Sequence, residues 1–300
     1  MVLFFLISFA VGIAVYFFSQ PLGILVFALA LLFWGVPIAF SLGLVGVAGL
    51  LFFHGSINGL NTLPIVAEHT ATNFVLLAIP LFTLGGLILS RSGLGEQMYE
   101  LSGKWLGWMP GGLGVATCIT GGILAAMIGS STAVTAIITL VALKPLLDRG
   151  YDKKMVIGTV TGSSLGLIIP PSIGFIVYGF LTNTSVPKLF LAGFVPGILL
   201  AVLFMAFIFS ACVVRPQLGS HRNVATWGER IRSLKDLVPI LLIFIMVIGS
   251  IYTGFATPTE AAALGVLGAL GIALFYKKIS LGMLYATVEG TMKTCLLYTS

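Results

Sequence analysis

No Asp, Glu, Lys or Arg precedes Glu68, and several later stretches of the chain are equally free of charge. A helix that spans a membrane needs about 20 consecutive, mostly apolar residues. The chain is 58% hydrophobic and 8% charged, whereas soluble domains carry about 25% charged residues. Only helices and closed barrels satisfy their backbone hydrogen bonds inside lipid. The sequence therefore predicts an all-α integral membrane protein built as a multi-span helical bundle.

The basic residues cluster in short loops at 144–154, 215–236 and 277–278. Cytoplasmic loops of membrane proteins carry such an excess of Lys and Arg. The net charge of +6 therefore indicates the cytoplasmic loops of a multi-pass membrane protein, with the lipid bilayer rather than nucleic acid as its partner. We find no nucleophile–base or phosphate-loop pattern, and the three cysteines show no metal-ligand spacing. An enzyme and a protein with a bound cofactor are both disfavoured.

Apolar runs predict where the spans lie. Simple spans are expected at 2–19, 73–90, 189–214, 237–252 and 259–276. The run over 22–53 exceeds one span, so we expect a kinked or two-part element around Pro37. We expect a polar extracytoplasmic connection at 54–72, an amphipathic stretch at 91–110, and a surface arm with a helix over 227–237.

The first of two interruptions lies inside the uncharged run 111–143. Its midpoint is Gly129, Ser130, Ser131 and Thr132, a turn followed by a good helix start. The run is long for one span and short for two, so we interpret it as a re-entrant hairpin with a polar tip. The alternative is a patch of small residues at which helices pack.

The second interruption breaks the span 155–181. Its notable residues are Ser163, Ser164, Gly166, Ile169, Pro170, Pro171 and Ser172. An ordinary proline kink is the alternative, but a double proline after Ser-Ser and Gly disrupts a helix more strongly. Broken helices survive in membranes only where they are buried in protein or line a wet cavity. Two breaks close together in sequence predict a transport site.

The two breaks contain no side chain that carries a full charge. No acidic residue lies between Glu100 and Asp148, and no Lys or Arg lies between Lys104 and Lys144. A proton relay usually needs Asp, Glu or His. Carbonyl and hydroxyl oxygens at unwound helices instead suit Na+, and the free N–H groups of a half-helix that begins near Ser131 suit a carboxylate.

Two further patterns concern the second half of the chain. Residues 22–53 and 238–275 both read as long apolar runs divided by one proline, Pro37 or Pro258. This likeness suggests an inverted repeat of which the second copy is incomplete. The run Thr257, Pro258, Thr259, Glu260 has the pattern of a capping box for the following helix. Direct contact of these residues with an ion or substrate is the alternative.

Six ordered motifs make the chain resemble the large membrane subunit of tripartite ATP-independent periplasmic (TRAP) transporters. They are GVPIAF at 35–40, IPLF at 79–82, GSSTA at 129–133, IPPSI at 169–173, LAGFVPG at 191–197 and GFATPTEAAA at 254–263. The resemblance implies an elevator-type transporter with inverted repeats. It also implies a small membrane subunit and a periplasmic solute-binding protein as partners. Na+ would be the coupling ion, and the substrates would be carboxylates such as C4-dicarboxylates, sialic acids or sugar acids.

The same resemblance implies how the chain divides into parts. Residues 1–72 would be scaffold helices and 73–214 the transport region of the first repeat. Residues 215–236 would be a cytoplasmic amphipathic arm, and 237–300 the start of the second repeat. The tip 129–132 and the segment 163–172 would together bind one Na+ and flank the substrate. The implied Na+ ligands come from Ser130, Ser131, Gly166, Ile169 and Pro171.

This chain departs from the family pattern at two positions and in its length. Ile128 stands where members often have Ser, and Val134 where they often have Thr or Asp. Because the family's second hairpin and its partner helix would follow residue 300, we expect a C-terminally truncated sequence. A stand-alone Na+/anion carrier of the same superfamily and a non-transporting membrane scaffold protein remain the alternative functions.

Overall fold

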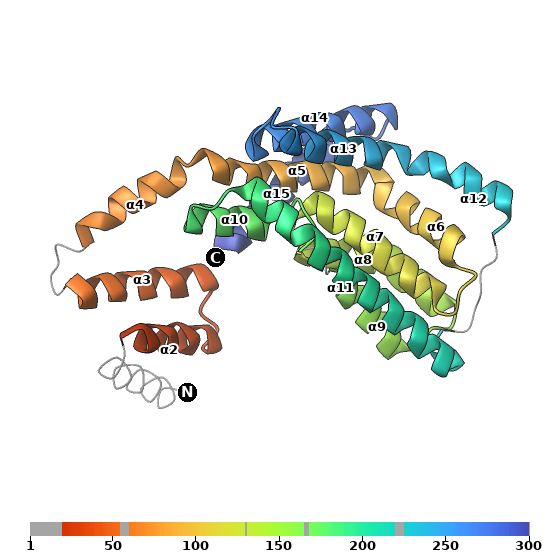
Figure 1. The fold of residues 1–300 in the computed structure, drawn as a ribbon, viewed down its shortest axis with the longest axis horizontal. Coiled ribbons are helices and arrows are strands. Elements are labelled where there is room, and N and C mark those ends of the chain that lie inside the picture. The colour runs from red at the N-terminus through yellow and green to blue at the C-terminus, as the bar shows by residue number, and fades with distance from the viewer. Residues whose placement is uncertain (1–19, 55–59, 130, 165–167, 220–224, 300) are drawn as a thin grey trace. The chain divides into compact units, whose positions relative to one another are not determined.

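The computed structural model describes residues 20–54, 60–129, 131–164, 168–219 and 225–299, and every regular element in these ranges is helical (Figure 1). Three helical stretches are long and apolar enough to cross a membrane: Phe74–Leu106, Val186–Val214 and Pro258–Phe275. The pair Trp227–Asp236 and Val238–Tyr252, bent by 42°, also qualifies when taken as one span. The expected all-helical membrane class is confirmed.

Contacts divide the chain into two units, the first of which holds the helices before Phe74. In this unit α2 (Gln20–Phe33) and α3 (Ile38–His54) pack on each other. The chain turns between them at Gly35, whose φ is +78°, and Pro37 directly precedes α3. The expected two-part element over 22–53 is therefore confirmed.

The expected polar connection over 54–72 contains a helix that the sequence did not predict, α4 (Thr62–Ala71). None of the residues of α4 is buried, so packing within the unit does not explain it. Its single proline, Pro64, lies in the first turn, where no intrahelical hydrogen bond is lost. Leu63, Ala67 and Glu68 then supply good helix formers.

The second unit begins with one helical stretch in four parts. These are η2 (Phe74–Leu77), α5 (Ala78–Leu89), the wider turn η3 (Ser90–Leu94) and α6 (Gly95–Leu106). The expected apolar span 73–90 and amphipathic stretch 91–110 correspond to α5 and α6, and the helix continues from one into the other. Gly93 adopts φ +84° inside the stretch, a conformation that costs other residues more. The wider turn thus joins the apolar α5 to the amphipathic α6.

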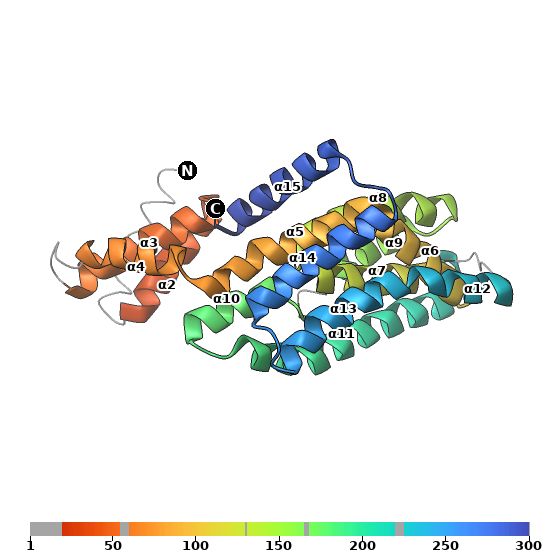
Figure 2. The same cartoon turned by 90° about the horizontal axis from the view of Figure 1, so that it is seen from above.

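Next come the two elements that contain the predicted breaks. The run 111–143 forms α7 (Gly112–Ile128) and α8 (Ser131–Asp148), which pack on each other. The broken span forms α9 (Lys153–Gly162) and α10 (Ile173–Thr182), and α11 (Val186–Val214) follows. Figures 1 and 2 show α7, α8, α9 and α11 as one group. The hairpin shape and the break match the sequence predictions, while re-entry from one membrane face stays a prediction.

The chain continues through five further helical elements, of which the fourth, α14, packs against α5 near the beginning of this unit. They are α12 (Trp227–Ser233), η6 (Leu234–Asp236), α13 (Val238–Tyr252), α14 (Pro258–Phe275) and α15 (Leu281–Thr299). Figure 2 shows α14 beside α5 along much of its length. A Cβ added to Gly85 would lie 3.5 Å from Val266 Cγ2, an ordinary contact distance. The Thr259 hydroxyl donates to the Phe74 carbonyl at 3.0 Å. This pairing anchors α5 against a helix far away in sequence.

The start of α14 is closed by the predicted capping box. The Thr257 hydroxyl accepts from the Glu260 backbone N–H at 3.4 Å, and the Glu260 carboxylate accepts from the Thr257 N–H at 2.8 Å. The interpretation of Thr257 and Glu260 as capping residues is therefore confirmed. Both side chains satisfy backbone donors that the helix itself leaves free.

Thr257→Ala is expected to lower the free energy of unfolding by about 1 kcal/mol, since it removes the acceptor at the helix start. Thr257→Ser keeps that acceptor and is the matched control. Thermal unfolding in detergent, together with hydrogen exchange of 258–262, measures the effect. Equal protection of these amides in both variants would contradict a capping role.

Candidate functional site

The hairpin tip is a sharp turn between α7 and α8. Its first residue, Gly129, has φ +69° and donates its N–H to the Ala125 carbonyl at 2.8 Å. A Cβ placed on Gly129 would lie 3.0 Å from Ile173 Cγ1 and 3.3 Å from Ile173 N. The tip therefore touches the first residue of α10. The structure brings together the two breaks that the sequence singled out.

Among the described residues between α9 and α10, 168–172 are non-helical and 170–172 are buried. Ser163 and Ser164 form a last tight turn after α9. Pro170, Pro171 and Ser172 are buried and lead into α10, with Ser172 extended at φ −124° and ψ 133°. Because Ser172 takes the N-cap position without a side-chain cap, its hydroxyl is left for another partner.

Glycines on α7 and α11 hold this unwound segment. A Cβ on Gly121 would lie 2.5 Å from both Ser163 Cβ and the Ser163 carbonyl oxygen. On α11, a Cβ on Gly193 would lie 2.9 Å from the Ile168 carbonyl oxygen, and one on Gly197 would lie 3.4 Å from it. Any larger residue at Gly121 or Gly193 would displace backbone. The segment is therefore clamped from two sides by helices that approach closely only because they lack side chains there.

A third helix supports the tip from outside the hairpin. A Cβ on Gly86 of α5 would lie 2.6 Å from Ile128 Cα and 2.9 Å from the Met127 carbonyl oxygen. Neither this contact nor the one at Gly121 was predicted from the sequence. The paired glycines 85–86 and 121–122 were the available signal, because small residues mark close helix packing in membranes.

The hydroxyl groups near the break differ in their hydrogen bonds. Ser163 and Ser164 donate to the carbonyls of Val160 and Thr161, each at 2.7 Å. A hydroxyl that donates in this way still has lone pairs with which to accept or coordinate. The Ser172 hydroxyl is 1% exposed and has no hydrogen-bond partner among the described residues. A buried hydroxyl left unpaired costs free energy, so the Ser172 hydroxyl is a candidate to contact a bound ion or substrate.

The electrostatics of the site come from helix ends. Two helix starts, α8 at Ser131 and α10 at Ile173, lie next to each other, since Gly129 contacts Ile173. Each helix start is equivalent to roughly half a positive charge. The described part of the chain holds no cluster of three His, Cys, Asp or Glu that suits a metal ion. The arrangement can therefore favour an anion at the helix starts and a hard cation at carbonyl oxygens.

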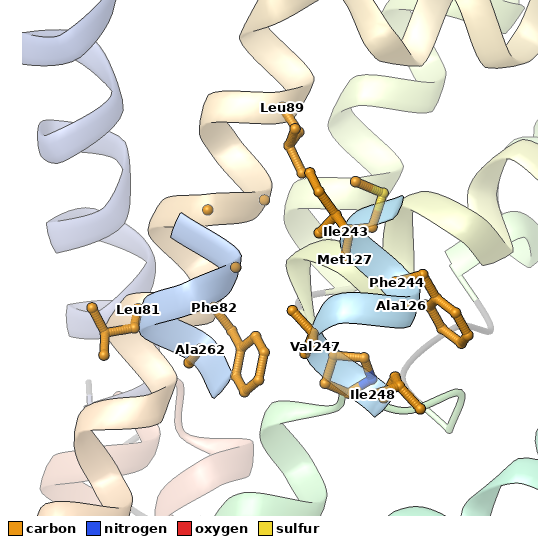
Figure 3. A pocket seen from close by; sticks show the side chains of 14 residues that line it. Leu81, Phe82, Leu89, Ala126, Met127, Ile243, Phe244, Val247, Ile248 and Ala262 are labelled. Atoms are coloured by element: carbon orange, nitrogen blue, oxygen red, sulfur yellow. The ribbon is translucent and has the colours of Figure 1, made fainter. Parts of the chain in front are cut away.

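The side chains of two expected Na+ ligands lie in apolar surroundings. Ile169 lines a cavity of about 280 Å³ between α7, α11 and α13. Pro171 lines a cavity of about 30 Å³ between α5, α7, α13 and α14, whose labelled side chains in Figure 3 are all apolar. Only their backbone carbonyls are suited to hold an ion. Ser130 and Gly166 lie outside the described residues, and so does the side chain of Thr132.

Comparison with known proteins shows which protein family the sequence matches. The family model described as "Tripartite ATP-independent periplasmic transporter, DctM component" matches residues 25–298. The chain is 33% identical over 242 residues to the C4-dicarboxylate TRAP transporter large permease protein of Vibrio cholerae, covering 80% of this chain and 53% of that protein. It is 31% identical over 268 residues to the sialic acid TRAP transporter large permease protein of the same organism, covering 89% and 62%.

A third relative is the 2,3-diketo-L-gulonate TRAP transporter large permease protein of Escherichia coli. It is 32% identical over 263 residues, covering 87% of this chain and 61% of the relative. The chain thus spans between 53% and 62% of the length of these three relatives. The names of all three describe transport of compounds with a carboxylate group.

Proposed function

Since this chain belongs to the DctM family of tripartite ATP-independent periplasmic transporter components, we propose that it forms part of a permease that imports organic acids. The family is one of transporter permeases, not of enzymes. The proposed substrates are C4-dicarboxylates, sialic acids or sugar acids, the classes in the names of the relatives. The proposed location is the bacterial inner membrane.

One observation carries this proposal: the hairpin tip meets the unwound segment at Gly129 and Ile173. The starts of α8 and α10 come together there without any Lys or Arg nearby in sequence. A carboxylate at this place receives backbone N–H groups and the positive ends of two helices. Because no basic side chain fixes the anion, release requires only that these helix ends separate or rehydrate.

We propose Na+ as the coupling ion on the chemistry of the same region. Unwound carbonyls and hydroxyls are the ligands that Na+ uses in secondary transporters. The carbonyls of Ile169 and Pro171 and the hydroxyls of Ser131, Ser163 and Ser172 are the proposed contributors, together with Ser130 and Gly166. The unpartnered Ser172 hydroxyl supports a bound group at the break, because its lone pairs can coordinate a cation that the carbonyls of the preceding segment hold.

The proposed mechanism is of the elevator type. Residues 73–214 would carry the substrate, and 1–72 would belong to the static scaffold. The helix pairs α2–α3 and α13–α14 each have a proline at their junction, Pro37 or Pro258, which supports related scaffold elements at 1–72 and 237–300. A small membrane subunit and a periplasmic solute-binding protein are the proposed partners.

The test is reconstitution of the complete permease with both partners in liposomes. Labelled C4-dicarboxylate, sialic acid and sugar acid are offered with an inward Na+ gradient, with an equal K+ gradient, and without the solute-binding protein. We expect uptake of one class that needs both Na+ and the binding protein. Uptake that ignores the Na+ gradient would contradict the coupling, and uptake without the binding protein would favour a stand-alone carrier.

Ser172→Ala is expected to raise the Na+ concentration for half-maximal uptake about three- to tenfold, the effect of losing one buried polar contact. Uptake at saturating Na+ should stay near the wild-type rate, because backbone ligands remain. Ser250→Ala is the control, since the Ser250 hydroxyl donates to the Val247 carbonyl of its own helix at 2.9 Å. An unchanged Na+ dependence in Ser172→Ala would remove Ser172 from the ion site.

A further inference from the structure

A third cavity lies away from the hairpin tip, between α6, α8 and the start of α7. Its volume is about 550 Å³, and its lining includes Tyr99, Glu100, Lys104, Leu140, Lys144 and Arg149. This volume lies in the range of ligand sites. The basic loop 144–154 assigns it to the predicted cytoplasmic side.

Some of the charged residues that line this cavity form an ion pair with each other, and others do not. Lys104 Nζ lies 3.6 Å from Glu100 Oε2, an ion pair within α6. Neither Lys144 nor Arg149 forms an ion pair in the described ranges of the chain. Glu96 also lines the cavity but is exposed to solvent. Two free cations on α8 and its end therefore face a cavity whose acids are paired or solvated.

A buried hydroxyl also belongs to this cavity. Tyr99 is 6% exposed, and its hydroxyl has no hydrogen-bond partner within bonding distance among the described residues. The Thr117 hydroxyl interacts with it and donates its own proton to the Leu113 carbonyl at 2.7 Å, so its lone pairs stay available to Tyr99. Arg149 lies close enough to Tyr99 for an electrostatic interaction. The cavity thus combines two cations with a buried tyrosine hydroxyl.

Exposed apolar residues indicate which anion suits this cavity. Leu140, one of the lining residues, is 83% exposed. Trp108, which follows the end of α6 at Leu106 and does not line the cavity, is 51% exposed. Tryptophan prefers the level of lipid headgroups. An exposed Leu beside free cations suits an acyl chain next to a phosphate. Basic pockets between membrane helices on the cytoplasmic side bind anionic headgroups.

We propose that the cavity between α6 and α8 binds the phosphate of an anionic phospholipid of the cytoplasmic leaflet. Lys144 and Arg149 contribute charge, the Tyr99 hydroxyl donates to a phosphate oxygen, and Leu140 lies along an acyl chain. The bound lipid connects the base of the hairpin to α6. This site is separate from the proposed transport site and does not depend on its chemistry.

The test measures lipid retention by native mass spectrometry. The purified chain is equilibrated with mixed micelles of phosphatidylcholine and phosphatidylglycerol. Lys144→Gln combined with Arg149→Gln should weaken phosphatidylglycerol binding at least about tenfold, given the contribution of each cation near a membrane surface. The matched control, Lys153→Gln with Lys154→Gln, removes the same charge from exposed residues that do not line the cavity. It should bind like the wild type.

Tyr99→Phe is the second variant, because it removes only the hydroxyl and leaves the packed ring. It should weaken phosphatidylglycerol binding about two- to tenfold, the range for one hydrogen bond to a charged acceptor. Equal losses in the two double variants, or equal retention of phosphatidylcholine and phosphatidylglycerol, would overturn the proposal. Displacement of the lipid by inorganic phosphate at constant ionic strength would overturn the lipid assignment in favour of a soluble anion.

Discussion

Gly121→Ala is expected to abolish uptake by the reconstituted permease, whereas Gly122→Ala leaves uptake close to the wild-type rate. The two glycines are neighbours in the middle of α7, so alanine gains the same helix propensity at each, about 1 kcal/mol. They differ in the atoms that an added methyl group would contact. At Gly121 the methyl group would lie 2.5 Å from the Ser163 carbonyl oxygen, which is a clash. At Gly122 its nearest neighbour would be Ile169 Cδ1 at 3.7 Å, an ordinary contact distance.

The two variants differ because alanine at Gly121 must displace backbone, whereas alanine at Gly122 contacts only the end of a side chain. The Ser163 carbonyl is backbone at the beginning of the unwound segment, so it cannot rotate away as a side-chain tip can. Forced overpacking of a well-packed interior typically costs about 1–3 kcal/mol, which offsets or exceeds the gain in propensity. The displacement also changes the proposed ion and substrate ligands directly. Uptake of labelled substrate and thermal unfolding are measured on the same preparations, and indistinguishable variants would contradict this packing argument.

Gly129→Ala is expected to have the second large effect, a loss of most uptake with a lowered free energy of unfolding. Its φ of +69° costs an alanine roughly 1 kcal/mol. The new methyl group would also press against Ile173, 3.0 Å from its Cγ1 and 3.3 Å from its backbone N. The tip and the start of α10 would then separate, and the two helix starts would no longer converge.

A comparison with Gly254→Ala separates the backbone cost of a positive φ from the steric contact with Ile173. Gly254 has φ +73°, and a Cβ there meets nothing within 4 Å. It therefore carries the same backbone cost without a steric contact. We expect both variants to lose stability in thermal unfolding, Gly129→Ala more because of its contact with Ile173, and only Gly129→Ala to lose uptake. If Gly254→Ala lost uptake equally, general destabilisation rather than the geometry of the tip would explain the result.

The sequence predicted much of the fold because the relevant signals are local. The uncharged run with Gly129 at its centre predicted two helices joined at a turn, and the structure has α7 and α8 there. The double proline at 170–171 predicted a break, and α9 and α10 lie on either side of it. Thr257 and Glu260 predicted a helix start for the same reason. Helix-breaking and helix-capping residues influence the backbone conformation only within a few residues of their own position.

Local signals also explain what the sequence left open. The polar composition at 54–72 predicted a connection without a helix, and propensity supports the exposed helix α4 there. The charges after Arg91 predicted an amphipathic stretch, and Gly93 lets the helix continue into it through a wider turn. Composition reports the environment of a segment more directly than its backbone conformation.

The sequence by itself determined the helical membrane class, the positions of the two breaks and the absence of full charges within them. Only the tertiary structure decided that Gly129 touches Ile173, that Gly121 and Gly193 clamp the unwound segment, and that Gly86 supports the tip. It also decided that Ser172 is buried without a partner. Close approach and unpaired burial depend on two segments far apart in sequence, and a hydropathy pattern carries information about only one segment at a time.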